Sequence, residues 1–470
     1  MLGFNFESKT KPTVYNNVDS YFDIPTANLV IGAKKETILN GGLGKIFAIV
    51  GSGNNYKSTI LHDMMLSAAD KVMATTDTAM ATYDTEVNVS TDRLDQLASK
   101  YEYIPKNPIT DAGIWSVTDK SIMSANAWVL SINAYIKNKI GSAKSMVTYT
   151  ALTDPYTKEP LRICAPTFVE IDSLSELEGE GSTTMLEGDL EDSGTNTFAM
   201  RQGMFKHKFL SQLPRLSGSS NTVFLMTAHI GKKIDMATGP AKYQQPSKQL
   251  QYLKAGDVLK GVTNKFNYLV NGGALFAHTA SKLLNQGTKL PEYPMDSSAD
   301  DPNELNIVRL TQLRGKNGTS GYTLDVLVSQ YTGVLFDLTK FHYIKSKGRY
   351  GLVGSAHNYE LVMYPGTKLS RSTVRAKIDN DAKLAKAIQF TSDLLQLHTF
   401  HRHLDDVGLL CTPEELYEDI KKLGYDWNVL LDTRSWLTVD QYSDKVKPFL
   451  SIVDLLKMRK ELYKPYWLKG

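Results

Sequence analysis

The stretch Gly51-Ser52-Gly53-Asn54-Asn55-Tyr56-Lys57-Ser58-Thr59 decides the expected fold of this chain. It follows the apolar run at residues 45–50 and precedes a segment with helical character. The spacing is that of a phosphate-binding loop (Walker A), except that Tyr56 replaces the second glycine. In such a loop backbone N–H groups point at the β- and γ-phosphates, the Lys57 ammonium neutralises them, and the Ser58 hydroxyl ligates Mg²⁺. We therefore expect a nucleoside triphosphate site; a tight turn that binds nothing is the alternative.

Two later strand-like runs end in acidic residues. Residues 80–86 end at Glu86, and residues 167–173 carry Asp172 near their end. In a parallel sheet the carboxyl ends of such strands lie at the same edge as the phosphate loop, where ligands bind. One carboxylate there orients the attacking water and another supports Mg²⁺. Either strand alone is more typical of ordinary core ending in a solvated acid, but the three elements in this order predict an α/β nucleotide-binding core.

Several stretches together resemble one family. They are Ile24-Pro25-Thr26-Ala27-Asn28-Leu29, the Gly41-Gly42 step, the phosphate loop with an aromatic residue before its lysine, and Tyr83-Asp84-Thr85-Glu86. Together they look like the RecA-type recombinases and, within that family, most like the bacteriophage branch known as UvsX. The resemblance runs in order from about residue 24 to about residue 397.

The resemblance implies a fold, an activity and partners. The fold is α/β, a RecA-like P-loop ATPase core with a mostly parallel sheet, a short N-terminal arm and a mainly helical C-terminal region. The activity is DNA-dependent hydrolysis of ATP to ADP and phosphate, with Mg²⁺ as cofactor. Subunits form a helical filament on single-stranded DNA and promote homologous pairing and strand exchange with double-stranded DNA, in recombination, repair and recombination-dependent replication. Single-strand-binding and loader proteins are further implied partners.

The resemblance and the composition divide the chain into four parts. Residues 1–23 form the arm, residues 24–350 the ATPase and DNA-binding core, residues 351–397 a C-terminal lobe and residues 398–470 an additional helical extension beyond the resemblance. The arm carries scattered aromatic residues and, by the resemblance, docks on a neighbouring subunit. A loosely ordered tail is the alternative.

Two helix starts are expected in the extension. A capping box at residues 412–415, with proline at the first helical position, predicts a helix that Gly424 ends. Thr438 with Gln441 has the same spacing and predicts a second helix start.

Composition limits the class of protein. With 470 residues, 42% hydrophobic and 22% charged, the chain has an ordinary soluble-globular composition. Its net charge of +3 is nearly neutral, so any nucleic-acid binding requires local patches. Cys164 and Cys411 give neither a disulfide framework nor a metal-ligand spacing and suit a reducing compartment. Without a long apolar run or a signal-peptide pattern, we expect no membrane association and a cytoplasmic location, in a bacterial host if the chain is phage-encoded.

The resemblance assigns roles around the nucleotide. Glu86 orients water, Asp172 supports the metal ion beside Ser58, and His229 senses the γ-phosphate. Arg93 stands where relatives place a tyrosine, and its planar guanidinium would stack on the base. A lone histidine after a strand is usually structural, and that alternative remains open.

Two cations follow the strand-like run at residues 305–313. By the resemblance, Arg314 and Lys316 reach a neighbour's γ-phosphate, so hydrolysis would require assembly. Otherwise, two basic residues beside a turn are typical of solvated surface. Residues 314–321 also look like the finger segment of DnaB-type helicases, so a ring-forming replicative helicase is the alternative function. A DNA-coating scaffold that hardly hydrolyses ATP is a third hypothesis.

Candidate DNA contacts lie in two segments. Residues 174–200 are rich in Gly, Ser and Thr and are predicted to form a mobile loop. They carry seven acids and no Lys or Arg, so they should repel phosphates. The basic segment that follows holds Arg201 and Lys206. After His229, cations alternate with aromatic rings, which suits a single strand because cations hold its backbone and rings stack on its bases. The candidates there are Lys232, Lys233, Lys242, Tyr243, Lys248 and Tyr252. A solvated helix face and a solvated loop are the respective alternatives.

Overall fold

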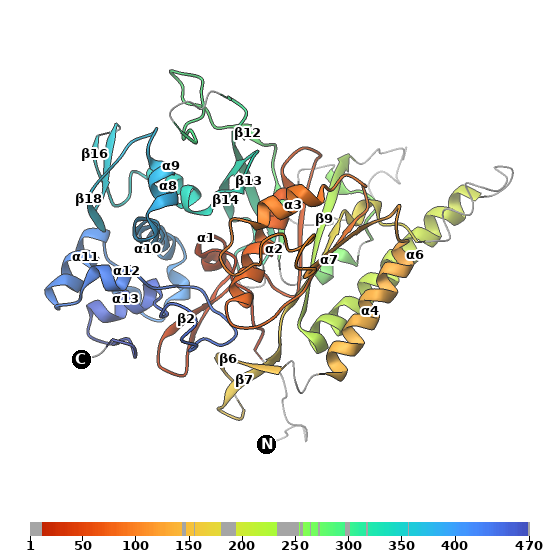
Figure 1. Cartoon of the computed structure of the whole chain (residues 1–470), viewed down its shortest axis with the longest axis horizontal. Coiled ribbons are helices and arrows are strands. Elements are labelled where there is room, and N and C mark those ends of the chain that lie inside the picture. Colours follow the sequence, from red (N-terminus) through yellow and green to blue (C-terminus); the bar gives the residue numbers. More distant parts are fainter. Residues whose placement is uncertain are drawn as a thin grey trace, which may run out of the picture.

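The computed structural model describes most of the chain. The described residues are 12–142, 147–154, 156–179, 194–232, 253, 257–263, 265–270, 273–296, 301–315, 318–355 and 357–468, with backbone alone for 194–200. They form a mixed α/β structure around an 11-stranded sheet (Figure 1). No described helix combines the length and the apolar character that crossing a bilayer requires.

The strands are β1 (Asn28–Ile31), β2 (Thr37–Asn40), β3 (Ile46–Gly51), β4 (Met80–Asp84), β5 (Trp115–Asp119), β6 (Val147–Thr153), β7 (Pro160–Cys164), β8 (Thr167–Asp172), β9 (Thr222–Lys232), β10 (Asp257–Leu259), β11 (Ala274–Ala277), β12 (Ser281–Lys282), β13 (Leu305–Arg314), β14 (Thr323–Ser329), β15 (Gly333–Val334), β16 (Leu352–Ser355), β17 (Asn358–Leu361) and β18 (Tyr364–Leu369). The helices are α1 (Ser20–Asp23), α2 (Lys57–Met73), α3 (Thr91–Ala98), α4 (Ala125–Gly141), α6 (Gly194–Ser220), α7 (Phe266–Leu269), α8 (Phe336–Ser346), α9 (Val374–Asn380), α10 (Ala382–Thr399), α11 (Pro413–Lys422), α12 (Trp427–Leu431) and α13 (Ile452–Arg459). Short 3-10 turns include η2 (Leu174–Glu176).

The centre of the main sheet is parallel. Nine of its strands run in the order β15-β14-β13-β11-β3-β9-β8-β4-β5, and every pairing from β11 to β5 is parallel. The other two, β10 and β12, pair with β9 and β13. The strands β13, β14 and β15 extend this block as antiparallel neighbours. This architecture confirms the predicted α/β class with a mostly parallel sheet.

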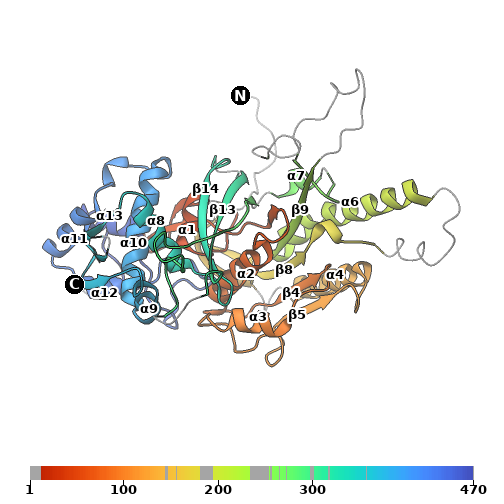
Figure 2. The same ribbon diagram turned by 90° about the horizontal axis from the view of Figure 1, so that it is seen from above.

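Helices cover both faces of the sheet because the buried strands are apolar on both sides. Along β3, Phe47 and Ile49 join the core beneath α2 and α8, while Ile46, Ala48 and Val50 join the core beneath α4 and α6. Figure 2 shows α6 projecting at the end of the molecule opposite the C-terminal helices. The alternation along a single strand therefore builds two hydrophobic cores, one on each face.

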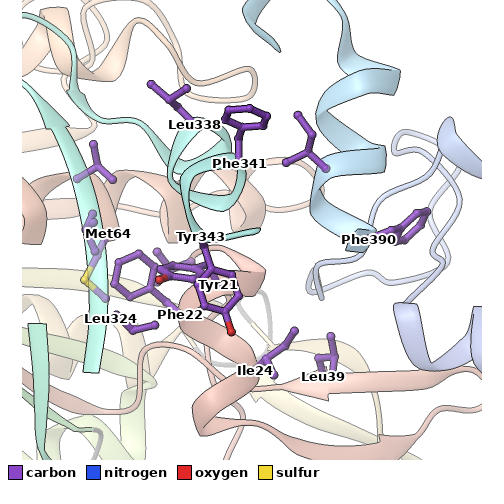
Figure 3. Packing of buried hydrophobic residues seen from close by; sticks show 14 of the residues in the cluster. Tyr21, Phe22, Ile24, Leu39, Met64, Leu324, Leu338, Phe341, Tyr343 and Phe390 are labelled. Atoms are coloured by element: carbon purple, nitrogen blue, oxygen red, sulfur yellow. The ribbon is translucent and has the colours of Figure 1, made fainter. Parts of the chain in front are cut away.

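The segment before β1 packs inside its own chain. Tyr21 and Phe22 of α1 are almost fully buried, and their rings lie 5.2 Å from Tyr343 and 6.0 Å from Phe336, respectively, between ring centroids (Figure 3). Asp19 caps α1 and accepts a hydrogen bond from the buried ammonium of Lys340 at 2.8 Å. Of the predicted arm, Val18, Tyr21 and Phe22 are thus part of this core, and residues 1–11 lie outside the described residues.

The C-terminal residues continue the same core. α10 extends to Thr399, beyond the predicted boundary at residue 397, and its apolar face packs with α11, α12 and α13. This region also contacts the start of the chain: the Asp454 carboxylate accepts from Thr37 N at 2.7 Å, and Leu437 N donates to Asn17 Oδ1 at 2.6 Å. Residues 398–468 therefore pack on the N-terminal strands as well as on α10.

One predicted helix start is confirmed and the other is wrong. α11 begins after Thr412 with a complete capping box formed with Glu415. The segment at Thr438 forms no helix: Gln441 Oε1 accepts from Thr438 N at 3.4 Å, but the Thr438 hydroxyl donates to the Lys71 carbonyl oxygen at 2.8 Å instead of capping a first turn. The loop predicted for residues 174–200 is also too long, since α6 begins at residue 194.

Candidate nucleotide-binding site

The predicted phosphate loop joins the central strand β3 to α2. Tyr56 lies in the left-handed region with φ 56° and ψ 21°, the conformation that favours the glycine it replaces. Its ring packs against the core and its hydroxyl accepts from Asn306 Nδ2 at 2.9 Å. A Cβ on Gly51 would lie 2.7 Å from the Ala277 carbonyl oxygen, so only glycine fits there. The packing of the partly buried ring and a hydrogen bond thus hold the tyrosine in a conformation that it would rarely adopt alone.

The first turn of α2 fits an anionic ligand. Tyr56 makes no side-chain cap, so no side chain from that position covers the N–H groups of the first turn. Lys57 is 6% exposed, and its ammonium donates to the Ser52 carbonyl oxygen at 2.6 Å. Burial lowers the pKa of Lys57, while the Asp172 and Glu86 carboxylates act in the opposite direction. A partly desolvated cation beside uncapped N–H groups is a chemical match for phosphate oxygens.

Glu86 and His229 meet at the carboxyl edge of the sheet. The Glu86 Oε1 and His229 Nε2 atoms lie 2.6 Å apart, and Ser173 Oγ lies 3.2 Å from the same oxygen. Partial burial raises the pKa of Glu86, but the hydrogen bonds from His229, Ser173 and Asn88 outweigh it and the pKa is lowered. The structure therefore brings together two residues that are 143 positions apart in the sequence and presents an ionised carboxylate.

The backbone that carries Glu86 is fixed by Asp84. The two carboxylate oxygens of this buried residue accept four backbone N–H groups, from Glu86, Val87, Asn88 and Val89, at 2.7–3.0 Å. Val87 takes a positive φ of 55° within this turn. Sequence reasoning did not assign Asp84 a role of its own, although an aspartate two residues before a turn residue is a known signal for such a backbone cap.

Candidate metal ligands lie at the same edge. Ser58 follows Lys57 in α2, and Asp172 ends β8 in register with Asp84 of β4. Asp172 is 6% exposed, and its Oδ1 accepts from the Thr227 hydroxyl. A serine hydroxyl and a carboxylate are oxygen donors of the kind that Mg²⁺ prefers. Within the described part of the chain, no three His, Cys, Asp or Glu side chains gather as a metal-binding group.

A buried ion pair lies beneath α2 and was not anticipated. His62 Nε2 is 3.1 Å from Glu170 Oε2, and both side chains are almost fully buried. Glu170 also accepts from the Thr82 hydroxyl at 2.9 Å, which in turn accepts from Trp115 Nε1 at 2.9 Å. Burial lowers the pKa of His62, but the Glu170 carboxylate, together with the Asp172 and Asp63 carboxylates, outweighs burial and raises the pKa to about 9. This pair links α2 to β8, the strand that carries Asp172.

Arg93 has structural partners. Its guanidinium donates to the carbonyl oxygens of Gln330, at 2.6 Å, and Tyr331. Asp63 of α2 holds the same turn by accepting from Val334 N at 2.6 Å. The structure places Arg93 against the turn before β15, and its predicted stacking on a base stays a prediction.

Of the two predicted trans-acting cations, one is described. Arg314 ends β13, is half-buried, and donates to the Asn267 carbonyl oxygen at 2.5 Å. Lys316 lies outside the described residues. Their action on a neighbouring subunit remains a prediction.

The predicted DNA contacts divide into three groups. Arg201 is exposed on α6, and Lys232 is exposed at the end of β9 and paired with Asp257. Lys206 does not fit the prediction: it is 5% exposed, and its ammonium donates to the Ser175 and Gly261 carbonyl oxygens at 2.7 Å each, so it is structural. The remaining candidates, Lys233, Lys242, Tyr243, Lys248 and Tyr252, lie outside the described residues.

Comparisons with known proteins add no identity. No protein-family model matches the chain, and no curated protein matches it.

Proposed function

We propose that this chain is a DNA-dependent ATPase of the recombinase type that assembles on single-stranded DNA and exchanges strands with a homologous duplex. The observation that carries the ATPase part is the meeting of Glu86 and His229 at 2.6 Å beside the phosphate loop and Asp172. An acid, a cation and uncapped N–H groups at one sheet edge are what phosphoryl transfer to water requires. The recombinase part rests on the sequence resemblance.

Each residue has a defined task in this proposal. Lys57 and the N–H groups of the loop bind the triphosphate, and Ser58 and Asp172 would hold Mg²⁺, which neutralises phosphate charge when bound. The ionised Glu86 accepts a hydrogen bond from the attacking water and aligns it. His229 is hydrogen-bonded to the Glu86 carboxylate. Loss of the γ-phosphate would alter this contact, and the resulting shift of His229 would be passed along β9 to the residues that follow it.

Imaging separates this proposal from the ring-helicase alternative, which is favoured by the residue pattern at the β13–β14 turn. The purified chain is examined by electron microscopy with single-stranded DNA, Mg²⁺ and a slowly hydrolysed ATP analogue. Open helical filaments on the DNA are expected. Closed rings would overturn the recombinase assignment and leave the ATPase assignment standing.

A further inference from the structure

A basic cavity lies at the opposite edge of the sheet from the phosphate loop. Its volume is about 660 Å³, and it lies between the start of β3, strand β7 and the C-terminal end of α6. Figure 1 shows the β6–β7 hairpin at the lower edge of the molecule, near the lower ends of α4 and α6. Because β3 has six residues, the cavity is about 17 Å from the nucleotide site along this strand.

The described residues that line the cavity include cations and no acid. Lys45 and Arg162 line it together with neutral side chains, and none of its described lining residues is acidic. A second ammonium lies close by: Lys139 of α4 is 3% exposed and donates to the Thr167 hydroxyl at 2.7 Å. A cluster of cations without a carboxylate partner favours an anionic ligand.

The electrostatics of the two lysines agree with this geometry. Burial lowers the pKa of Lys45 to about 8 and that of Lys139 to about 8. The nearby Cys164 thiol acts in the opposite direction on both, and Lys45 lowers the pKa of Lys139 further. An anion between these groups would relieve their mutual repulsion.

An aromatic face adjoins the cations. Tyr149 of β6 is 55% exposed and lies directly across the hairpin from Arg162, whose guanidinium is 5.3 Å from the centre of its ring. Exposed rings beside cations bind single-stranded nucleic acids, because bases stack on the ring while cations hold the phosphates. Neither feature lies at the C-terminal ends of β8 and β9, which are at the other edge of the sheet.

We propose that this cavity binds a phosphate of a single-stranded nucleic acid, with Lys45 and Arg162 as its cations and Tyr149 as a stacking face. The site provides a second nucleic-acid contact on the side of the sheet opposite the ATPase site. This inference rests on the proposed function in one respect only, the choice of a nucleic acid over a free phosphate compound as the ligand.

The test measures binding of a fluorescently labelled oligothymidylate to the full chain, without nucleotide and over a range of salt concentrations. The variants are Arg162→Ala, Tyr149→Ala and Lys45→Met. Arg349→Ala is the matched control, because Arg349 is also exposed and lies 5.7 Å from a tyrosine ring, far from the cavity. Arg162→Ala should reduce the slope of log affinity against log salt by about 0.7, and Tyr149→Ala should weaken binding about tenfold.

The outcomes separate this inference from the proposed function. Binding equal to wild type in all three cavity variants would overturn the inference while DNA-stimulated ATP turnover still supports the proposed function. Calorimetry with inorganic pyrophosphate tests the other source of phosphate: pyrophosphate binding that Arg162→Ala abolishes, with oligonucleotide binding unchanged, would also overturn it. If the wild type binds no oligonucleotide under any condition, the proposed function fails as well.

Discussion

Glu86 is the residue on which hydrolysis depends in this account. Its backbone is held by the four hydrogen bonds that the Asp84 carboxylate accepts, and its side chain is held by His229. Its position therefore does not require a ligand. Replacing it with glutamine should lower ATP turnover about 10²- to 10³-fold, because an amide is a much weaker acceptor for the proton of water. Asp92→Asn, a neutralised exposed acid in the first turn of α3, is the matched control. Turnover by Glu86→Gln within a few-fold of the control would contradict the assignment.

The buried His62–Glu170 pair makes stability depend on pH. The pKa of His62 rises from 6.5 to about 9 on folding, so the folded chain holds this proton more tightly. Its contribution is fully present below pH 6.5 and is lost as the pH rises through about 9. The free energy of unfolding of wild type relative to His62→Gln should therefore fall by on the order of 1–3 kcal/mol across this window. Denaturant titrations at several pH values measure it, and a constant difference would refute the proposed ion pair.

Lys206 and Arg201 provide a contrast on one helix. Lys206→Met should lower the free energy of unfolding by about 1–3 kcal/mol, because the Ser175 and Gly261 carbonyl oxygens lose a charged donor. Arg201→Ala, at an exposed position, should change it by less than about 0.5 kcal/mol. Urea denaturation of both variants tests this, and equal effects would contradict the buried placement of Lys206.

The local sequence pattern predicted the position of residues that follow apolar strands. It did not predict the contacts of residues whose partners are distant in the sequence. Lys57, Glu86 and His229 follow apolar runs whose order fixed a common sheet edge, so their proximity could be expected. The partners of Lys206 and Arg93 are backbone carbonyls that only the folded chain brings near, and no spacing in the sequence encodes them.

At the scale of elements, the phosphate loop is tied to β13. The Tyr56 hydroxyl and Asn306 join α2 to the start of the strand whose other end is Arg314. Tyr56→Phe keeps the ring in place and removes this hydrogen bond. The ordered conformation of the loop should thereby be destabilised by about 1 kcal/mol. We expect a several-fold higher KM for ATP with little change in kcat.

A double-mutant cycle tests this tether. Asn306→Ala should raise KM to a similar extent, and the double variant should be no worse than either single one. Fully additive effects would show that the hydrogen bond is not the cause.

The two capping patterns show why element boundaries were harder to predict than element types. Thr412 precedes a proline and an amphipathic run, so its helix forms. Thr438 has a correctly spaced glutamine, and Gln441 Oε1 does accept from Thr438 N, but the Thr438 hydroxyl donates to the Lys71 carbonyl oxygen, so a tertiary hydrogen bond takes the place of the helix cap. The β6–β7 hairpin was not predicted either. Its two strands pair with each other outside the main sheet, and the sequence pattern indicated only strands of the main sheet.

At the scale of the whole molecule, the two ends of the chain share a core. Thr37 N donates to the Asp454 carboxylate, and Asn17 Oδ1 accepts from Leu437 N. The two residues of each pair are more than 400 positions apart. The sequence resemblance ended at residue 397 and therefore could not predict this contact. The C-terminal residues are expected to be needed for folding of the core around the main sheet.

Calorimetry measures this coupling. The full chain should unfold in a single transition, and a chain that ends at residue 397 should lose that transition because the apolar face of α10 becomes exposed. Two separate transitions in the full chain, with the first absent from the shortened chain, would show that the C-terminal part folds independently.

Steady-state ATP turnover with and without single-stranded DNA tests the central claim most directly. The account predicts Mg²⁺-dependent hydrolysis that single-stranded DNA stimulates and that Lys57→Ala abolishes. Hydrolysis that persists in Lys57→Ala, or no hydrolysis by the wild type with DNA present, would contradict it.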